Sequence, residues 1–212
     1  MKHENSRALF AYWDSVRGSN LAPQRFEIDP SRITTILPYT FILERCDAET
    51  FNYRLAGTRM CDVFGHELRG TNFLDGWDTI DRLPLLRQFS VLVRQGSVGV
   101  VYVEIAAKRE KAVECEVLLL PLRHTRDAID RVLGCFSPLQ SPHWLGEKPV
   151  VSKHVILNDV IWPSRDPLAT LSRPKEPPPL MPSSATRIVR SERRQFRVFD
   201  GGLLSRTDCE KT

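Results

Sequence analysis

Asp75 and Glu104 are the side chains with which this chain could carry out acid–base chemistry. A carboxylate held in an apolar cavity has a raised pKa, so either residue could exchange a proton at neutral pH in an isomerase or lyase reaction. The sequence contains no GxSxG, HExxH or glycine-rich phosphate loop that would aim such a group at a substrate. A small cavity enzyme is therefore the weakest of the functions considered for this chain.

Cysteine and histidine show no spacing that is typical of a site. The cysteines form no CxxC pair, and no Cys/His pair has the spacing of zinc ligands. An odd number of scattered thiols favours free cysteines in a reducing compartment. The N-terminus lacks an apolar leader and no run is long enough to span a bilayer, so we expect a cytoplasmic protein without membrane insertion or structural metal. The five cysteines are Cys46, Cys61, Cys115, Cys135 and Cys209.

Arg59 is a cation whose position points to a ligand. It follows Gly57 and Thr58 at the expected start of a short helix. A cation at a helix N-terminus is unfavourable by about 0.3–1 kcal/mol, because it meets the positive end of the helix dipole. A bound anion would remove this cost, whereas an exposed arginine with its charge in water needs no ligand. The sequence leaves both interpretations open.

Residues 146–212 differ in composition from the rest of the chain. They hold 12 Lys and Arg against 8 Asp and Glu, which accounts for the formal net charge of +4, and 8 of the 15 prolines. This composition predicts an extended, mostly disordered tail. Its arginines could contact phosphates, but Glu192 interrupts them and only Phe196 and Phe199 could stack on bases. Nucleic-acid binding is therefore the runner-up function, and the tail could equally dock on an acidic protein. The arginines are Arg187, Arg190, Arg193, Arg194 and Arg197.

Five β-patterned runs surround a helical middle segment. Two come first, at residues 40–46 and 51–57, and three follow at 98–107, 112–122 and 129–138. Runs joined by connections of a few residues must pair antiparallel, because a parallel crossover needs a dozen residues or more. The order predicts an α+β domain with a five-stranded antiparallel sheet and helices on one face. Such an arrangement leaves a pocket between sheet and helices, which suits sensing better than catalysis.

Helical spacing of apolar residues predicts helices over residues 6–17, 30–37, 58–64 and 81–95. The first is amphipathic and ends at a glycine. The second has an aspartate and a proline at its start, which are strong start signals. The apolar stripe of the first helix is unusually aromatic for so short a segment. It consists of Leu9, Phe10, Trp13 and Val16.

Four segments together resemble the PAS sensor domain family. The run 51–59 (FNYRLAGTR) followed by 64–70 (FGHELRG) is similar to its second strand, short helix and G-x-x-L-x-G turn. The runs 10–14 (FAYWD) and 73–77 (FLDGW) resemble a group of small bacterial PAS proteins without a fused kinase, cyclase or DNA-binding domain. The resemblance covers about residues 6–140. It implies a domain that binds a small molecule or cofactor, pairs with another copy and relays a change to a partner.

The resemblance divides the chain into three parts. N-terminal helices occupy residues 1–39, a PAS-like domain residues 40–140, and a proline-rich basic tail residues 141–212. The segment Phe196–Gly202 is similar to a tail motif of the same group, and its alternation predicts a short strand at 196–199. We expect this strand to dock as an added strand or on a partner.

The resemblance also allows some cofactors to be set aside. The photoactive flavin subclass needs a cysteine in the segment that corresponds to 70–75, and here there is none. Haem-binding relatives commonly place a histidine on the long helix, and residues 81–95 contain none. The ligand therefore stays unknown, although the large side chains that face the sheet predict an apolar cavity. The candidate pocket residues are Arg59, Met60, Phe64, Trp77, Phe89, Tyr102, Cys115 and Phe136.

The aromatic stripe of the N-terminal helix predicts an interaction. It either folds onto the sheet or pairs with a second copy, and since such helices often mediate dimerisation in PAS proteins, the resemblance favours a homodimer. We expect a non-catalytic sensory or regulatory protein that binds a ligand, a signalling partner, or both. Because the relatives have no fused output domain, the response would pass to another protein, such as a kinase.

Overall fold

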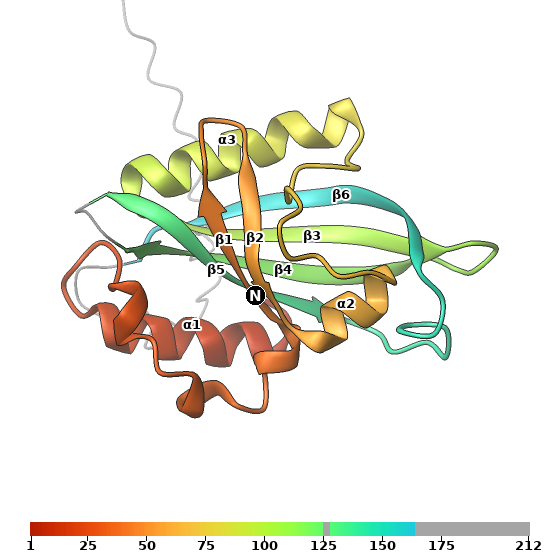
Figure 1. Ribbon diagram of the computed structural model, residues 1–212, viewed down its shortest axis with the longest axis horizontal. Helices are drawn as coiled ribbons and strands as arrows, with labels where there is room; N and C mark the ends of the chain where they lie inside the picture. The colour runs from red at the N-terminus through yellow and green to blue at the C-terminus, as the bar shows by residue number, and fades with distance from the viewer. Residues whose placement is uncertain (125–127, 164–212) are drawn as a thin grey trace, which may run out of the picture. The chain divides into compact units, whose positions relative to one another are not determined.

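The computed structural model describes residues 1–124 and 128–163, which form three α-helices, three short 3₁₀ turns and one antiparallel sheet (Figure 1). The sheet has the strand order β2-β1-β5-β4-β3-β6. The strands are β1 Thr40–Arg45, β2 Phe51–Ala56, β3 Val98–Ala107, β4 Val113–Arg123, β5 Ile129–Pro138 and β6 Val150–Ile161. The helices are α1 Glu4–Arg17, α2 Thr58–Phe64 and α3 Thr79–Gln95, with 3₁₀ turns η1 Arg25–Glu27, η2 Pro30–Ile33 and η3 Leu37–Tyr39. None of these described helices is long and apolar enough to cross a bilayer.

The α+β class and the antiparallel pairing are confirmed, but the prediction of five strands is wrong. A sixth strand, β6, pairs along β3 from Val98 to Ala107 and forms an edge of the sheet. The predicted tail therefore starts too early, because the segment 150–161 belongs to the sheet. No side chain of β6 is fully buried, so the strand lacks the clean alternation of a strand with one buried face. The strand predicted at 196–199 lies outside the described residues.

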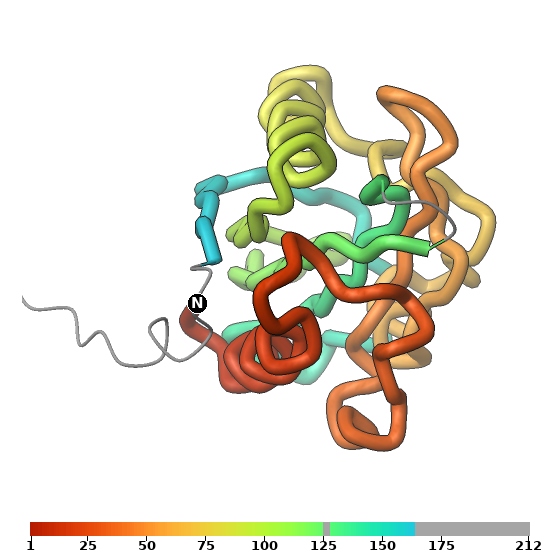
Figure 2. The backbone as a smooth tube through the Cα atoms, turned by 90° about the vertical axis from the view of Figure 1, so that its left-hand side faces the viewer, coloured from red at the N-terminus to blue at the C-terminus, as the bar shows by residue number. Residues whose placement is uncertain are grey.

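Helices cover both faces of the sheet, so the prediction of helices on one face is wrong. Paired residues in neighbouring strands point to the same side, so Gly99, paired with Leu119, lies on the face opposite to Glu116. Gln88 of α3 lies against Gly99, and the backbone N–H of Lys2, just before α1, donates to the carboxylate of Glu116. We call the face covered by α3 the inner face and the face covered by α1 the outer face. Figure 2 shows the two helices on opposite sides of the strands.

The apolar stripe of α1 packs on the sheet of its own chain. Leu9 and Trp13 are fully buried and Phe10 is 4% exposed. The Trp13 indole N–H donates to the carbonyl of Pro121 in β4 at 2.9 Å. Only Val16 of the predicted interface stripe is partly exposed. These side chains are therefore not a free surface for a second copy, because the apolar outer face of β4 and β5 needs their cover.

The second predicted helix is also wrong in type. Asp29 does cap a helical turn, since its carboxylate accepts the N–H of Ser31 at 2.9 Å, and Pro30 is the first residue of η2. However, the segment forms two separate 3₁₀ turns rather than an α-helix over 30–37. Pro38 disfavours helical backbone at the residue before it, and the two threonines at 34 and 35 are poor helix formers.

Aromatic rings fill the space between the inner face and the helices. The rings of Phe51 and Phe89 are stacked with their centroids 4.1 Å apart, and Phe73 packs edge-on against Phe89 at 5.3 Å. The ring of Phe41 lies directly against Gly134, where a Cβ atom would come within 2.0 Å of it. This core ends near the loop between α2 and α3, where a pocket opens.

Candidate functional site

The segment between α2 and α3 forms one wall of this pocket, and it is fixed along the free edge of β2. Tyr53 donates its backbone N–H to Thr71 and accepts from Gly70, at 2.9 and 2.7 Å. Asn72 accepts the backbone N–H of Phe51 at 3.0 Å through its side-chain oxygen. These bonds satisfy backbone groups that an edge strand would otherwise expose, and they hold the segment 70–73 as a rigid wall.

The start of β6 forms the opposite wall. Gly65 ends α2 in the left-handed conformation, with φ of 72°, and Pro149 packs so closely that a Cβ on Gly65 would lie 2.6 Å from the Cβ of the proline. Glycine at this position therefore allows both the end of α2 and the close approach of the chain that enters β6. Lys153, paired with Ile105, then extends from β6 on the inner side of the sheet.

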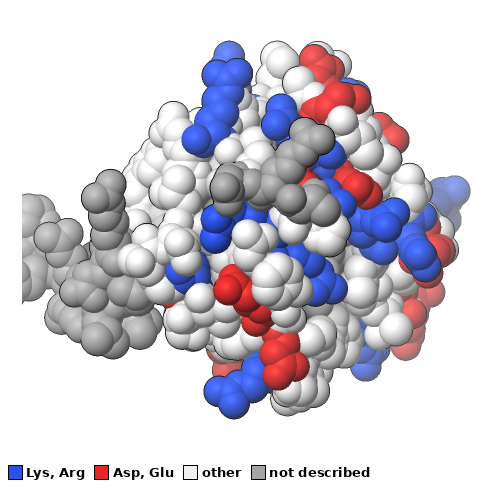
Figure 3. Space-filling model, turned by 60° about the vertical axis from the view of Figure 1, so that its left-hand side comes forward, with Lys and Arg blue, Asp and Glu red and all other residues white. Residues whose placement is uncertain are grey.

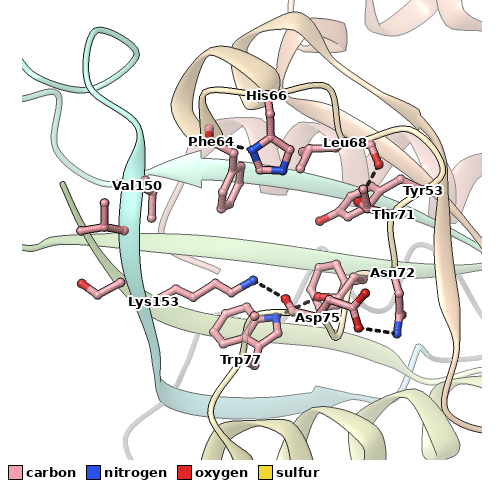
Figure 4. A pocket seen from close by; sticks show the side chains of 14 residues that line it. Tyr53, Phe64, His66, Leu68, Thr71, Asn72, Asp75, Trp77, Val150 and Lys153 are labelled. Atoms are coloured by element: carbon pink, nitrogen blue, oxygen red, sulfur yellow. Dashed lines mark hydrogen bonds between the residues drawn. The ribbon is translucent and has the colours of Figure 1, made fainter. Parts of the chain in front are cut away.

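We call the space between these two walls the β6 pocket (Figure 4). Its volume is about 420 Å³, within the range of sites for small molecules. The residues that line it come from β2, the segment 64–77 and the start of β6. They include Tyr53, Phe64, His66, Leu68, Thr71, Asn72, Asp75, Trp77 and Lys153.

Lys153 brings a cation into the β6 pocket. Its ammonium group donates to the carbonyl of Asp75 at 2.8 Å and lies 4.7 Å from the ring centroid of Trp77, over the ring. Burial lowers the pKa of Lys153 to about 8, and the nearby Asp75 carboxylate only partly offsets this effect. The lysine is therefore charged at neutral pH but poorly solvated, which favours an anion beside it.

Tyr53 supplies an unpaired hydroxyl to the same pocket. The residue is 7% exposed, and burial raises the pKa of its phenol well above the usual value. Its hydroxyl group points into the pocket in Figure 4 and has no hydrogen-bond partner among the described residues. The hydroxyl group is therefore open to the pocket and free to bond to a ligand that enters it.

Aromatic rings give the β6 pocket flat apolar walls. Trp77 donates its indole N–H to the carbonyl of Phe73 at 2.9 Å, which fixes the ring beside Lys153. Phe64 lies across the pocket and packs edge-on against Phe136 at 5.6 Å. The site therefore combines two rigid rings, one cation and one hydroxyl. Such a set can bind a planar molecule that carries an anionic group.

Neither of the two residues expected to support acid–base chemistry is buried. Asp75 and Glu104 are both exposed, and the Asp75 carboxylate accepts a hydrogen bond from the Asn72 amide at 3.2 Å. Among residues 1–124 and 128–163, no group of three His, Cys, Asp or Glu side chains is arranged to hold a metal ion.

Two of the eight predicted pocket residues, Phe64 and Trp77, line the β6 pocket. Four others are core residues on the inner side. Phe89 and Cys115 are fully buried, Met60 is 1% exposed and Phe136 is 4% exposed. Burial raises the pKa of the Cys115 thiol far above its usual value, so the thiol stays neutral. These four support the pocket from behind and do not line it.

The remaining two candidates, Tyr102 and Arg59, do not line the β6 pocket. Tyr102 lies on the outer face beside Glu116, with the ammonium group of Lys2 over its ring, 4.4 Å from the ring centroid. Burial is the main cause that raises the pKa of its phenol to about 12, and the hydrogen bond to Glu116 adds to this effect. Arg59 is exposed and lines a separate surface hollow with Asp62. Tyr102 was placed inside because strand alternation alone does not say which face the helices cover.

Sequence reasoning missed the two residues that give the β6 pocket its polarity. Tyr53 alternates with Phe51 and Leu55 along β2, which predicts burial but says nothing about the free hydroxyl. Lys153 lies in the strand that was taken for a tail. The available signal for a strand here was a lysine that lies between two apolar pairs, Val150–Val151 and Val155–Ile156.

Replacing Lys153 with methionine is expected to stabilise the protein at pH 7. Because burial lowers the pKa of Lys153 from 10.5 to about 8, the folded state binds this proton more weakly than the unfolded state. The lysine therefore destabilises the fold by roughly 1–3 kcal/mol below pH 8, and this cost disappears as the pH rises from 8 to 10.5. Denaturant unfolding at pH 7 and pH 10.5 measures the change.

The matched control is Lys108→Met, at an exposed lysine in the turn after β3. It should shift the unfolding midpoint little at either pH. A Lys153→Met protein that is less stable than the parent at pH 7 would contradict the assigned burial of the ammonium group.

The comparison with known families covers most of this structure. A family model described as a PAS domain matches residues 1–137, which include α1, α2, α3, the strands β1 to β4 and all but the last residue of β5. Neither the curated proteins nor the solved structures gave a match. The matched region is well over half of the chain and carries the predicted motifs. The chain therefore belongs to the PAS domain family.

Proposed function

We propose that this PAS protein is a non-catalytic sensor that binds a small aromatic anion in the β6 pocket and passes its state to a partner protein. PAS domains have a general sensory or regulatory role. The proposal adds the ligand class and the site. Its main support is one observation, the convergence of the half-buried Lys153 ammonium and the unpaired Tyr53 hydroxyl between aromatic walls.

An anion fits the β6 pocket better than a neutral molecule does. The Lys153 ammonium has lost much of its hydration, and an opposite charge within about 4 Å favours the charged form. A carboxylate can also accept the hydrogen of the Tyr53 hydroxyl, forming a charge-assisted hydrogen bond. The rings of Phe64 and Trp77 would then enclose the apolar body of the ligand.

The signal would leave the pocket through β6 and α3. The same strand that carries Lys153 is bonded to α3 at two further points. Asn158 donates to the carbonyl of Pro84 at 3.1 Å, and Gln88 donates to the carbonyl of Asp159 at 3.1 Å. A ligand that draws Lys153 away from Asp75 would therefore shift the balance between two positions of β6 and α3.

The receiver of this signal would be a separate signalling protein such as a kinase. A homodimer also stays a proposal, although its interface would not be the buried stripe of α1. The wider role of PAS domains in protein interactions and dimerisation agrees with both.

Benzoate and benzamide, titrated calorimetrically into the full chain at pH 7, test the ligand class because they share a shape and differ in charge. We expect benzoate to bind about tenfold more tightly, which corresponds to about 1.4 kcal/mol from the ion pair with Lys153. Lys153→Met should remove this preference, and Tyr53→Phe should weaken the binding of both. Lys108→Met should change neither affinity.

The pH dependence gives a second readout. Benzoate affinity should fall by about tenfold in total as the pH rises above 8 and should then level off, because the free protein loses the Lys153 proton at a lower pH than the complex does. Between pH 8 and 9, binding should take up a proton. Equal affinities for benzoate and benzamide would reject the proposal that the ligand is an anion. If neither compound binds and native mass spectrometry shows no bound molecule, the proposal that the β6 pocket is a ligand site is rejected.

A further inference from the structure

A second hollow, on the outer face of the sheet, combines exposed apolar side chains with arginines. Ile42 and Leu55 are partners in β1 and β2, and they form its floor beyond the part of the sheet that α1 covers. Phe26, in η1, forms a wall. Arg25, Arg54 and Arg131 surround these three. His124 completes the lining. We call the space lined by these seven residues the arginine groove; its volume is about 380 Å³.

The apolar side chains of the arginine groove are unusually exposed. Phe26 is 77% exposed and Leu55 is 44% exposed, although both are large and lie close together. Single exposed apolar residues are common on protein surfaces, but adjacent ones in a hollow indicate an interaction site. The groove is shallow, so it fits an extended chain better than a small molecule.

The charge of the groove is positive and held in place. Glu44 contacts Arg54 at 3.1 Å and Arg131 at 2.7 Å, so one carboxylate positions two guanidinium groups. Arg131 also contacts Asp130 at 3.6 Å, whereas Arg25 has no ion pair among the described residues. Figure 3 shows Lys and Arg side chains gathered on the face that carries this end of the sheet.

We propose that the arginine groove is the docking site for an acidic segment of a partner protein, a segment that also carries an aromatic or aliphatic side chain. The carboxylates would pair with Arg25 and Arg54, and the apolar side chain would cover Phe26 and Leu55. Arginine pairs well with carboxylates, since its planar fork matches two oxygens at once. Nucleic acid fits less well, because the apolar side chains of Ile42 and Leu55 make no favourable contact with phosphate groups.

This docking site is independent of the β6 pocket, which lies on the inner side of the sheet. The relay proposed above needs a partner surface, and the groove supplies one whether or not the ligand is an aromatic anion. Variants in the groove should therefore leave benzoate binding unchanged. Failure of one proposal can be told from failure of the other by measuring both.

Selection of a random-peptide library on the full immobilised chain tests the groove. We expect the enriched peptides to combine Asp or Glu with Phe, Leu or Trp, and to perturb the backbone amide signals of Phe26 and Leu55. Arg25→Glu and Arg54→Ala should each weaken the selected peptide by at least tenfold, and Phe26→Ser by about threefold to tenfold. Lys108→Glu, the control at a distant exposed lysine, should stay within twofold.

Arg54 and Phe26 are exposed, so replacing them should not unfold the protein. An unchanged unfolding midpoint of each variant shows that weaker peptide binding does not come from loss of the fold. The proposal is overturned if no peptide is enriched, or if binding of the enriched peptides does not depend on these three residues. It is also overturned if a single-stranded oligonucleotide displaces the peptide at equal affinity, which would assign the groove to nucleic acid.

Discussion

A chain that ends at Gly146 is expected to lose about 3 kcal/mol or more of its free energy of unfolding, because it lacks β6. The strand pairs with β3 from one end to the other, and Val155 and Ile161 pack against the core. Removing it exposes the apolar inner side of β3 and deprives a whole row of backbone groups of their partners. Urea unfolding followed by circular dichroism measures the loss.

The matched control is a chain that ends at Pro163, which retains all the contacts of β6 described above. Its unfolding midpoint should stay close to that of the full chain. If both shortened chains unfold at the same midpoint as the full chain, β6 contributes nothing to the domain. The β6 pocket would then lack a stable wall, since Lys153 and its neighbours come from this strand.

Replacing Trp13 with alanine is expected to destabilise the domain by about 3–5 kcal/mol, which is the usual cost of deleting a buried tryptophan. The side chain is fully buried between α1 and the outer face, and its indole N–H bonds to the carbonyl of Pro121. The change leaves a cavity and an unpaired carbonyl together. Thermal or denaturant unfolding should show a large drop in the midpoint.

Trp162→Ala is the matched control, because that tryptophan is 55% exposed just beyond the end of β6. It should change the free energy of unfolding by about 0.5 kcal/mol or less. The same pair of variants tests the place of α1. A Trp13→Ala protein as stable as the parent, but with a changed subunit number, would show that the stripe faces a second copy after all.

Much of the sheet could be predicted because its strands alternate and end at turns. The strands β3 and β5 begin and end at the predicted residues, 98–107 and 129–138. Three-dimensional packing decided the rest. No side chain of β6 is fully buried, so its residues follow no clear period, and its proline-rich, basic surroundings predicted a tail.

The candidate site shows a similar division. Phe64 and Trp77 were found because large apolar residues near a loop predict a pocket. The polar members were not found, because Tyr53 has the same pattern as a core residue and Lys153 lies in an unpredicted strand. Whether a buried hydroxyl has a partner depends on segments far apart in the chain, and a local pattern does not contain this information.

The match to the PAS family ends at residue 137, whereas the ammonium group of the β6 pocket comes from Lys153. In the proposed function, the cation that recognises the ligand thus belongs to a strand beyond the matched residues, and the matched residues supply the aromatic walls and the Tyr53 hydroxyl. On this proposal, changes confined to residues 150–153 would alter which ligand is bound while the residues matched by the family model stay the same. Chimaeras that exchange this segment between relatives would be expected to carry their preferences with it.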